Sequence, residues 1–411
     1  MKKILALFLA LAMTFALVAC GDKASDEGQT NTDGDTTNQT SGETIRIGIA
    51  APLTGTSAAY GELMVDGAQI AIDEVNANGG VNGKMLELVK MDDKNDPSEA
   101  ALVAQRFCDD DTITAVIAHG GSTNTLAGAP IYEAAGMPFI GPSSNNPTLT
   151  ELGYEYFVRL GLRDDRCGNQ VVAMIVNNLG IKKLGVIYAN NDYGVGNLEA
   201  ATSLGAEVVD SETYNPGLEK DFSTIINKLQ KAGCEGVVIY ADHADAGLYF
   251  QQARALGFDV PHVGQSALTY SQMIDLAGAD ALQNLYICVT FNPYSDRETV
   301  KNFMAKFQEI RPNEVPSEPC AGSYDIVKII AEAMSEGATR ENLAQWIKNT
   351  SPDHTSTFVM EEGCTLKSHM VWDEKGDIEP FGCSVLKVSE DGQFVNTDIS
   401  VDLTGLDLGI N

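Results

Sequence analysis

The chain has 411 residues, of which 44% are hydrophobic, and its 57 acidic side chains outnumber 27 basic ones, for a formal net charge of -30 at pH 7. This charge argues against nucleic acid or an anionic lipid surface as a partner, because both bind positively charged faces. The five histidines and eight cysteines form neither a His-Glu-x-x-His nor a Cys-x-x-Cys motif, so we expect no metal site and no cofactor.

The first twenty residues predict a lipoprotein signal peptide. Met1-Lys2-Lys3 is a short positive stretch, and the apolar run from Ile4 to Val18 is too short to cross a bilayer core as a mature helix. The small residues before Cys20 resemble the lipobox of bacterial lipoproteins, in which the cysteine is lipidated after cleavage. Two or more acyl chains would hold the protein on a membrane. The alternative is ordinary cleavage that leaves Cys20 as a free thiol.

Residues 21–43 predict a disordered acidic tether, because they are rich in Asp, Asn, Thr, Gln, Ser and Gly and contain no aromatic residue. From Thr44 onward the chain is longer than one hydrophobic core usually supports, so we expect two lobes. No second hydrophobic stretch approaches the length of a membrane span.

The body of the chain alternates short β-branched runs with longer amphipathic runs, which is the pattern of βαβ units. Before Gly161 it predicts strands and helices in alternation, at residues 45–50, 61–78, 85–91, 96–108, 114–118, 123–135 and 138–140, with a further strand at 156–160. After Gly161 the alternation restarts with a helix, at residues 164–179, 184–189, 195–204, 206–213, 222–232, 236–240 and 244–256. The sequence therefore predicts an α/β protein with two successive parallel sheets.

The loops that follow the strands are the predicted binding region, because open parallel sheets bind ligands beyond the carboxyl ends of their strands. Six of these loops are small and polar, and none contains lysine or arginine, which disfavours a phosphorylated ligand. They cover residues 52–60, 120–125, 141–146, 190–194, 242–245 and 264–270.

The loop before the helix at 123–135 favours one modest anion such as a carboxylate, because backbone N–H groups and the helix dipole point at it. Ser122 and Thr123 add hydroxyl donors there, although either could simply cap the helix. Asp242 follows a strong strand and could hold an ammonium group, with a helix N-cap as the alternative. Tyr60 and Tyr193 could cover an apolar side chain of a ligand or could be ordinary half-buried residues.

Seven cysteines other than Cys20 are scattered along the chain. Export permits disulfides, and Cys364 with Cys383 is the most plausible pair because both flank the same late segment. An odd number leaves at least one thiol unpaired, so buried free cysteines are the alternative for most of them.

Six motifs spread along the chain from residue 44 resemble a known family. They cover residues 45–80, 92–97, 131–133, 192–194, 220–223 and 371–377. The family is that of the leucine/isoleucine/valine-binding proteins, type I periplasmic binding proteins that serve branched-chain amino-acid ABC transporters as receptors.

The resemblance implies two lobes, each a parallel-sheet α/β sandwich, joined by three hinge crossovers. Lobe 1 would comprise residues 44–160 and 292–370, and lobe 2 residues 161–291 and 371–411. It also implies a monomeric receptor rather than an enzyme, anchored outside the cytoplasm by its lipid, with ABC permease subunits as partners and a small amino acid as ligand.

The positions of family ligand contacts are occupied by similar residues here. Ser122 corresponds to a serine that meets the amino acid's carboxylate, and Tyr60 and Tyr193 correspond to aromatic residues lining the cleft. The segment that contacts both carboxylate and ammonium corresponds to Ser143, Ser144 and Asn145.

Two positions depart from the leucine-binding pattern. Ser266 stands where those proteins have a glutamate against the ammonium group, and Asp242 stands where they have a tyrosine. A carboxylate that has moved between neighbouring loops would preserve recognition of an α-amino acid. Otherwise the ligand is an amide, a short-chain carboxylate or an aromatic acid, and Asn145, in place of the usual threonine, leaves that choice open. A sensor protein that reports its bound state to a receptor is a further alternative to transport.

Overall fold

The computed structural model describes residues 44–55, 57–312, 314–350, 358–361, 370–378 and 382–406, which belong to one unit, Gly42–Asn411. The predicted signal peptide with Cys20, the tether at 21–43, and Cys364 lie outside the described residues. In the part of the chain that is described, no helix combines the length and the apolar character that a membrane span needs.

The first sheet has five parallel strands in the order β2-β1-β3-β4-β5. Ile47 in the central strand β1 lies opposite Leu88 on one side and Ala115 on the other. The strands are β1 Ile45–Ala51, β2 Leu86–Asp92, β3 Ile113–Ala118, β4 Phe139–Gly141 and β5 Phe157–Arg159.

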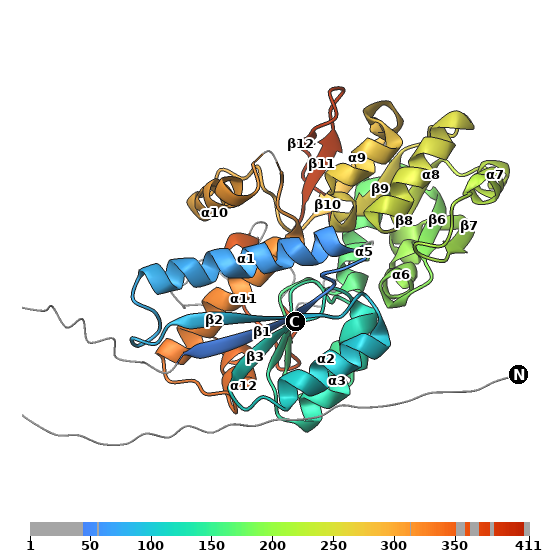
Figure 1. Ribbon diagram of the computed structural model, residues 1–411. Helices are drawn as coiled ribbons and strands as arrows, with labels where there is room; N and C mark the ends of the chain where they lie inside the picture. Colours follow the sequence, from blue (N-terminus) through green and yellow to red (C-terminus); the bar gives the residue numbers. More distant parts are fainter. Residues whose placement is uncertain are drawn as a thin grey trace, which may run out of the picture. The chain divides into compact units, whose positions relative to one another are not determined.

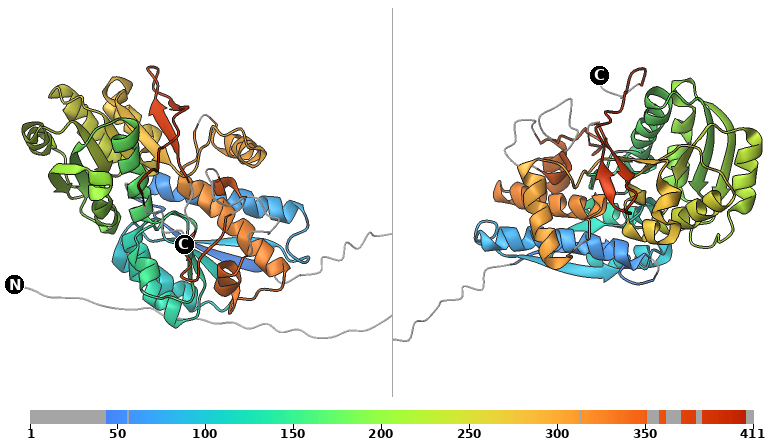
Figure 2. Two further views of the ribbon diagram at one scale, coloured as in Figure 1. Left: turned by 180° about the vertical axis from the view of Figure 1, so that it is seen from behind. Right: turned by 90° about the horizontal axis from the view of Figure 1, so that it is seen from above.

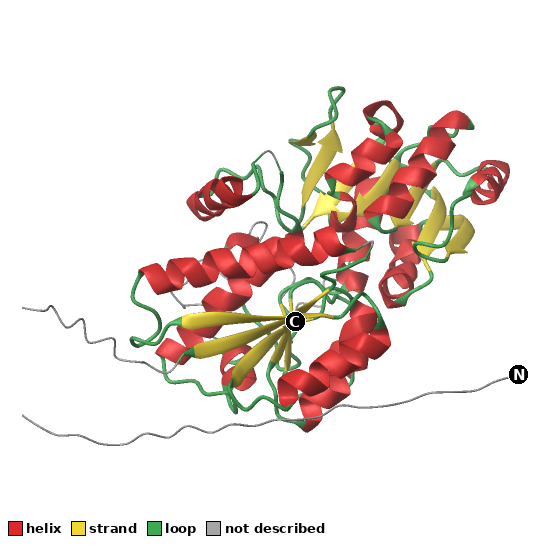
Figure 3. Cartoon of the chain, viewed as in Figure 1, coloured by secondary structure: helices red, strands yellow, loops and turns green. Residues whose placement is uncertain are grey.

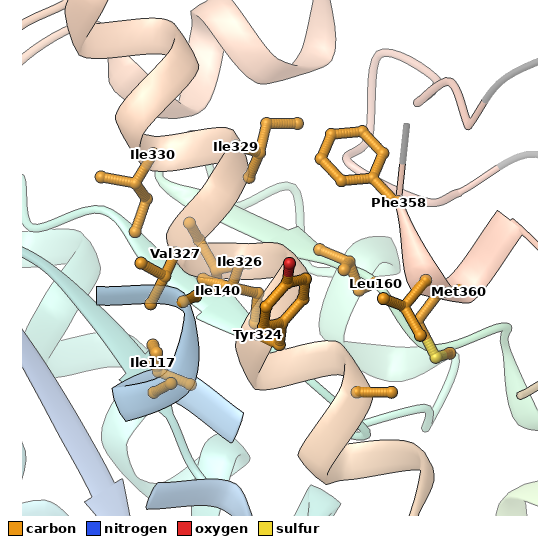
Figure 4. Close-up of a cluster of buried hydrophobic side chains, with 14 of the residues drawn as sticks. Ile117, Ile140, Leu160, Tyr324, Ile326, Val327, Ile329, Ile330, Phe358 and Met360 are labelled. Atoms are coloured by element: carbon orange, nitrogen blue, oxygen red, sulfur yellow. The ribbon is translucent and has the colours of Figure 1, made fainter. Parts of the chain in front are cut away.

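Helices cover both faces of this sheet, as the alternation of buried residues along β1 requires. Ile47 and Ile49 point toward α1 and α11, whereas Ala50 belongs to the separate cluster beneath α2 and α3 (Figure 1). Figure 4 shows the side of this core where Ile326 and Ile330 of α11 lie against the sheet. The helices are α1 Ala58–Ala77, α2 Pro97–Cys108, α3 Ser122–Ala134, α4 Thr148–Glu151, α10 Glu298–Ile310, α11 Glu318–Ser335 and α12 Leu343–Lys348.

The second sheet has seven strands in the order β12-β11-β10-β9-β8-β6-β7 (Figure 3). The strands are β6 Lys183–Ala189, β7 Glu207–Tyr214, β8 Gly236–Tyr240, β9 His262–Gln265, β10 Leu285–Val289, β11 Ser384–Val388 and β12 Phe394–Asn396. Its helices are α5 Asp164–Ala173, α6 Asp192–Leu198, α7 Ser223–Ala232, α8 His243–Ala255 and α9 Ser271–Ala277, with short 3-10 turns at Ser266–Leu268 and Ala279–Leu282. Alternate residues of β8 again divide between two helix-covered cores, with Val237 and Ile239 in one and Val238 and Tyr240 in the other.

The α/β prediction is confirmed, and each predicted strand and helix has a counterpart within a few residues. The second sheet is parallel from β7 to β10, and two further strands extend it, because β11 pairs antiparallel with β10 and with β12. β11 and β12 form a hairpin at the edge of that sheet, drawn in red in Figure 2. Its turn contains Gly392 at φ 78°, a conformation that glycine adopts without a steric cost. The predicted helix at 164–179 also changes character, becoming a π-helical turn over Met174–Asn178.

The chain passes between the two sheets three times: after β5, after β10, and between Ile378 and β11. A buried ion pair ties the first passage to the third, with Arg159 Nε 2.7 Å from Asp377 Oδ1. The indole N–H of Trp372 donates to the carbonyl oxygen of Arg159 at 2.7 Å. These contacts hold the connecting segments beside the loop that follows β4.

Candidate functional site

Residues that follow strands of the first sheet contact residues that follow strands of the second. The Thr123 hydroxyl donates to Asp192 Oδ2 at 2.8 Å, and Asn146 Nδ2 donates to the Asp192 carbonyl oxygen at 2.6 Å. Tyr60 stacks on Tyr270 with ring centroids 6.1 Å apart. The loops predicted to bind a ligand are therefore brought together from both sheets.

The aromatic part of the site is a row of three rings. Tyr60 from α1 lies beside Tyr270, which stacks in turn on the imidazole of His243 at a centroid distance of 4.4 Å. The Tyr60 ring packs directly against Gly120, because a Cβ atom at that position would lie 2.8 Å from the ring. Burial raises the pKa of the Tyr60 phenol well above its usual value, so the phenol stays neutral. Its hydroxyl is hydrogen-bonded to Ser143 Oγ.

Asp242 is the N-cap residue of α8, as the alternative interpretation held, but its side chain makes no capping hydrogen bond. Solvent reaches the exposed carboxylate, yet the surrounding protein reduces its hydration and raises its pKa to about 6, with a further contribution from the charge of Asp245. Among the described residues, no lysine or arginine forms an ion pair with Asp242.

Glu318 is a second carboxylate near the aromatic row. It is the first residue of α11, is only 5% exposed, and accepts a hydrogen bond from the Ser266 hydroxyl. Burial raises its pKa, and no described cation pairs with it. Glu318 is bonded to Ser266 in the loop that carries Tyr270, and Asp242 immediately precedes His243, whose ring stacks on Tyr270. The charges of both carboxylates help to raise the pKa of Tyr60.

The N-terminus of α3 lies beside this region. Its N-cap residue is Gly121, and no side chain caps the helix, so neither Ser122 nor Thr123 has the purely capping role. The Ser122 hydroxyl oxygen accepts the backbone N–H of Asn146 at 3.2 Å. The Ser122 hydroxyl proton and the N–H groups of the uncapped first turn lie together, an arrangement suited to one carboxylate, whereas the Thr123 hydroxyl is bonded to Asp192.

The three predicted residues after β4 occupy different environments. Ser143 reaches the aromatic row through Tyr60. Ser144 is fully buried, where its hydroxyl is bonded to Thr125 Oγ1 at 2.6 Å and to the His119 carbonyl at 3.2 Å, so it supports the loop from inside. The half-buried side chain of Asn145 lies against Gly161, where a Cβ would come within 1.9 Å of its Oδ1.

The nearest guanidinium lies beneath this loop and is already occupied. Arg159 is fully buried, and its Nη1 donates to the carbonyl oxygens of Ser144 at 3.2 Å and Asn146 at 3.0 Å. Its Nη2 donates to Thr150 Oγ1 at 2.7 Å. Arg159 therefore fixes the loop rather than presenting its charge to a ligand.

Tyr193 lies in α6 and is half-buried, and its hydroxyl donates to Gln265 Oε1 at 3.2 Å. Gln265 Nε2 donates in turn to Asn197 Oδ1 at 2.6 Å. This chain of bonds connects the loops after β6 and β9. Close to it, burial raises the pKa of the Asp164 carboxyl to about 8.

Sequence reasoning missed Glu318 because the residue lies outside the six loops, at the start of a helix. An acidic residue there ordinarily indicates a favourable interaction with the helix dipole. The detectable signal was Ser266, the departure from the leucine-binding pattern, since Glu318 supplies a carboxylate to that position from another element. Tyr270 and His243 lay in predicted loops, but their stacking could not be read from the sequence.

Two helix-covered, mainly parallel sheets with three passages of the chain between them define the type I periplasmic binding protein fold. A family model described as "Periplasmic binding protein" matches residues 44–362. The chain belongs to this family, within the leucine/isoleucine/valine-binding proteins. Its members are substrate-binding proteins rather than enzymes, and the family implies a location outside the cytoplasm.

Three known proteins illustrate the similarity. A leucine-, isoleucine-, valine-, threonine-, and alanine-binding protein of Pseudomonas aeruginosa is 30% identical over 361 residues, covering 85% of this chain and 91% of that protein. An amino acid binding protein of the same organism is 30% identical over 357 residues, with coverage of 85% and 91%. A similar solved structure is that of the branched-chain amino acid transporter substrate binding protein LivJ from Streptococcus pneumoniae in complex with isoleucine. The TM-score is 0.76 at 26% identity, and the similarity covers 86% of this chain and 100% of LivJ.

Proposed function

We propose that this protein is the receptor of an ABC importer and captures a small neutral amino acid, branched-chain or similar. One observation carries the proposal: two carboxylates without a described cationic partner, Asp242 and Glu318, flank the row of rings formed by Tyr60, Tyr270 and His243. An ammonium group would supply the missing cation. The names of the relatives, which refer to amino acids, support the same ligand class.

Each part of an α-amino acid has a complementary group. The ligand carboxylate would meet the first turn of α3, with the hydroxyls of Ser122 and Ser143 as donors, while the Thr123 hydroxyl stays bonded to Asp192. The ammonium group would face Asp242 and the Glu318 and Ser266 pair. The apolar side chain would lie against the row of rings, because aromatic faces bury apolar area without needing further polar partners.

We also propose that the ligand is enclosed by hinge motion between two lobes. Lobe 1 comprises residues 44–160 and 292–370, and lobe 2 residues 161–291 and 371–411. The three passages between the sheets are the candidate hinges. In this proposal Cys20 carries the lipid anchor, residues 21–43 form the tether, and the monomeric receptor delivers its ligand to membrane permease subunits.

A second candidate ligand is an uncharged amide. The raised pKa values of Asp242 and Glu318 favour it, because a protonated carboxyl group can donate a hydrogen bond to an amide carbonyl. This candidate would need neither the anion site at α3 nor an ionised Asp242. Its binding would therefore strengthen, or stay constant, as the pH falls.

A thermal-shift screen of the purified protein distinguishes the two. Amino acids, simple amides and aromatic acids are added separately at pH 7.5, and a ligand that binds the folded state raises the melting temperature. We expect leucine, isoleucine, valine or a similarly small amino acid to give the largest increase. A clear increase with an amide, and none with any α-amino acid, would reject the amino-acid proposal. Uptake of the ligand, measured in cells that contain or lack this protein, would separate import from sensing.

A further inference from the structure

One cysteine, Cys288, lies in β10, and a second, Cys383, immediately precedes its antiparallel partner β11. The register places Cys288 opposite Val385 and Val289 opposite Ser384. Side chains of a strand alternate between its two faces, so the residue two positions before Val385 projects on the same face. That residue is Cys383, and it is the diagonal neighbour of Cys288 across the pair.

The surroundings of the two thiols agree with this register. Cys288 is 5% exposed and belongs to the same buried cluster as Val385, and the half-buried Cys383 lies against that cluster. The interaction with the Cys288 thiol, together with burial, raises the pKa of Cys383 well above its usual value. The nearby Cys167 is engaged elsewhere, because its thiol donates to the Leu162 carbonyl at 3.4 Å.

We propose that Cys288 and Cys383 are joined by a disulfide in the protein outside the cytoplasm. That compartment, which the family implies, permits such bonds. A disulfide requires the two sulfur atoms to approach to about 2 Å, and the register already places the two side chains on one face of the strand pair. This pairing competes with the Cys364 to Cys383 pairing that the sequence suggested, since Cys383 can take part in only one of them.

The chemistry is thiol exchange with a disulfide oxidant such as oxidised glutathione or the disulfide of an extracytoplasmic oxidoreductase. The more accessible Cys383, after loss of its proton, attacks one sulfur of the oxidant and releases the other as a thiolate. Cys288, also deprotonated, then attacks the Cys383 sulfur and displaces the second thiolate. The two protein thiols lose two electrons and two protons, and the oxidant becomes two thiols. Because the raised pKa slows attack in the folded protein, we expect the bond to form while β10 and β11 are pairing.

The bond would act on the segments that connect the two sheets. β10 leads into the second passage and β11 receives the third, so a link between them would fix both segments at the second sheet. It would leave the first sheet free to move about the passages. The closed loop of roughly 95 residues also restricts the unfolded chain, and for a body of about 360 residues this predicts a melting temperature higher by about 6 °C.

Peptide mapping tests the pairing directly. The full protein is purified without reductant, incubated with oxidised glutathione under refolding conditions, alkylated, digested and analysed by mass spectrometry. We expect a linked pair of peptides carrying Cys288 and Cys383, no alkylation at either cysteine, and a reductant-dependent fall in melting temperature of about 6 °C. Full alkylation of both thiols after this treatment, or a link from Cys383 to Cys364 or Cys167, would overturn the proposal.

Variants separate the bond from a general effect of reductant. Cys383→Ala should abolish the linked peptides and the reductant-dependent shift, while Cys108→Ala, which also removes a half-buried thiol, should leave both unchanged. If Cys383→Ala fails to fold, the peptide map of the unaltered protein still decides the question. A reductant-dependent shift of equal size in Cys383→Ala would count against the bond.

Discussion

The pH dependence of ligand binding is the sharpest consequence of the proposed ammonium site. If the ligand's ammonium group pairs with ionised Asp242, protonation of that carboxylate must compete with binding. The pKa of about 6 makes Asp242 about 97% ionised at pH 7.5 and about 9% ionised at pH 5. The apparent dissociation constant rises as the competent fraction falls, so we expect roughly tenfold weaker binding at pH 5. Protonation of Glu318, whose pKa is also raised, would add to this loss.

Removing the charge gives a second measure of the same contact. An ammonium group about 4 Å from a carboxylate gains about 1 kcal/mol in water and about 4 kcal/mol at the effective dielectric constant of a protein surface. Because solvent reaches Asp242, the lower half of that range applies, and Asp242→Asn should weaken binding by about 1 to 2 kcal/mol, or about 5- to 30-fold. The variant should also lose most of the pH dependence below pH 6.

Isothermal titration calorimetry with the best amino acid from the screen, between pH 5 and 8, measures both effects. Asp275→Asn is the matched control, because it removes one negative charge from an exposed position on α9. An affinity that stays constant over this range in the original protein would refute the role of Asp242. The same conclusion would follow if Asp242→Asn kept the original affinity, or if the control variant weakened binding equally.

Three further predictions concern other parts of the molecule. Asp164→Asn should remove a loss of stability that grows with pH. The Asp164 carboxyl has a pKa of about 8 in the folded protein and about 3.9 in the unfolded chain, so the free energy of unfolding falls by up to about 1.4 kcal/mol per pH unit between those values. Urea unfolding at pH 5 and 7.5 can measure this fall in the original protein and its absence in the variant. Arg159→Met should destabilise the fold by about 1 to 3 kcal/mol, because the carbonyl oxygens of Ser144 and Asn146 lose their buried donor while Asp377 retains Arg163 as a partner, and a denaturation midpoint close to the original would contradict this. Gly67→Ala should cost about 1 to 3 kcal/mol, since its Cβ would lie 2.0 Å from the Cys320 carbonyl oxygen and force α1 away from α11, a loss that thermal unfolding would reveal.

Local patterns were sufficient to predict the fold up to residue 256. The strands are short β-branched runs that are buried on both faces, as Ile47 and Ile49 illustrate. Glycines that follow the amphipathic runs mark where the helices end. The antiparallel hairpin of β11 and β12 was not predicted, because its partner β10 lies about a hundred residues earlier in the chain. Pairing over such a distance leaves no periodic signal in either segment.

The site was predictable to the level of loops but not of contacts. Residues after parallel strands must meet at one edge, which is why Tyr60, Ser122, Thr123 and Asp242 were selected. Burial decided the rest: Ser144 follows the same strand as Ser143, yet it points inward and bonds to Thr125. Whether a polar loop residue faces a ligand or supports the loop depends on the packing beneath it, which adjacent positions in a sequence do not reveal.

The balance of charge within the site explains why a ligand with an ammonium group is favoured over an anionic one. Arg159 is the cation closest to the loop after β4, and its donors are taken by two carbonyl oxygens, a hydroxyl and the Asp377 carboxylate. Arg163 is similarly engaged by Asp165 and Glu151. The carboxylates Asp242 and Glu318 have no such partners among the described residues. The two arginines therefore hold the connecting segments in place, while the two carboxylates remain available to a ligand. A ligand without a positive charge would leave both negative charges unpaired unless Asp242 and Glu318 were protonated.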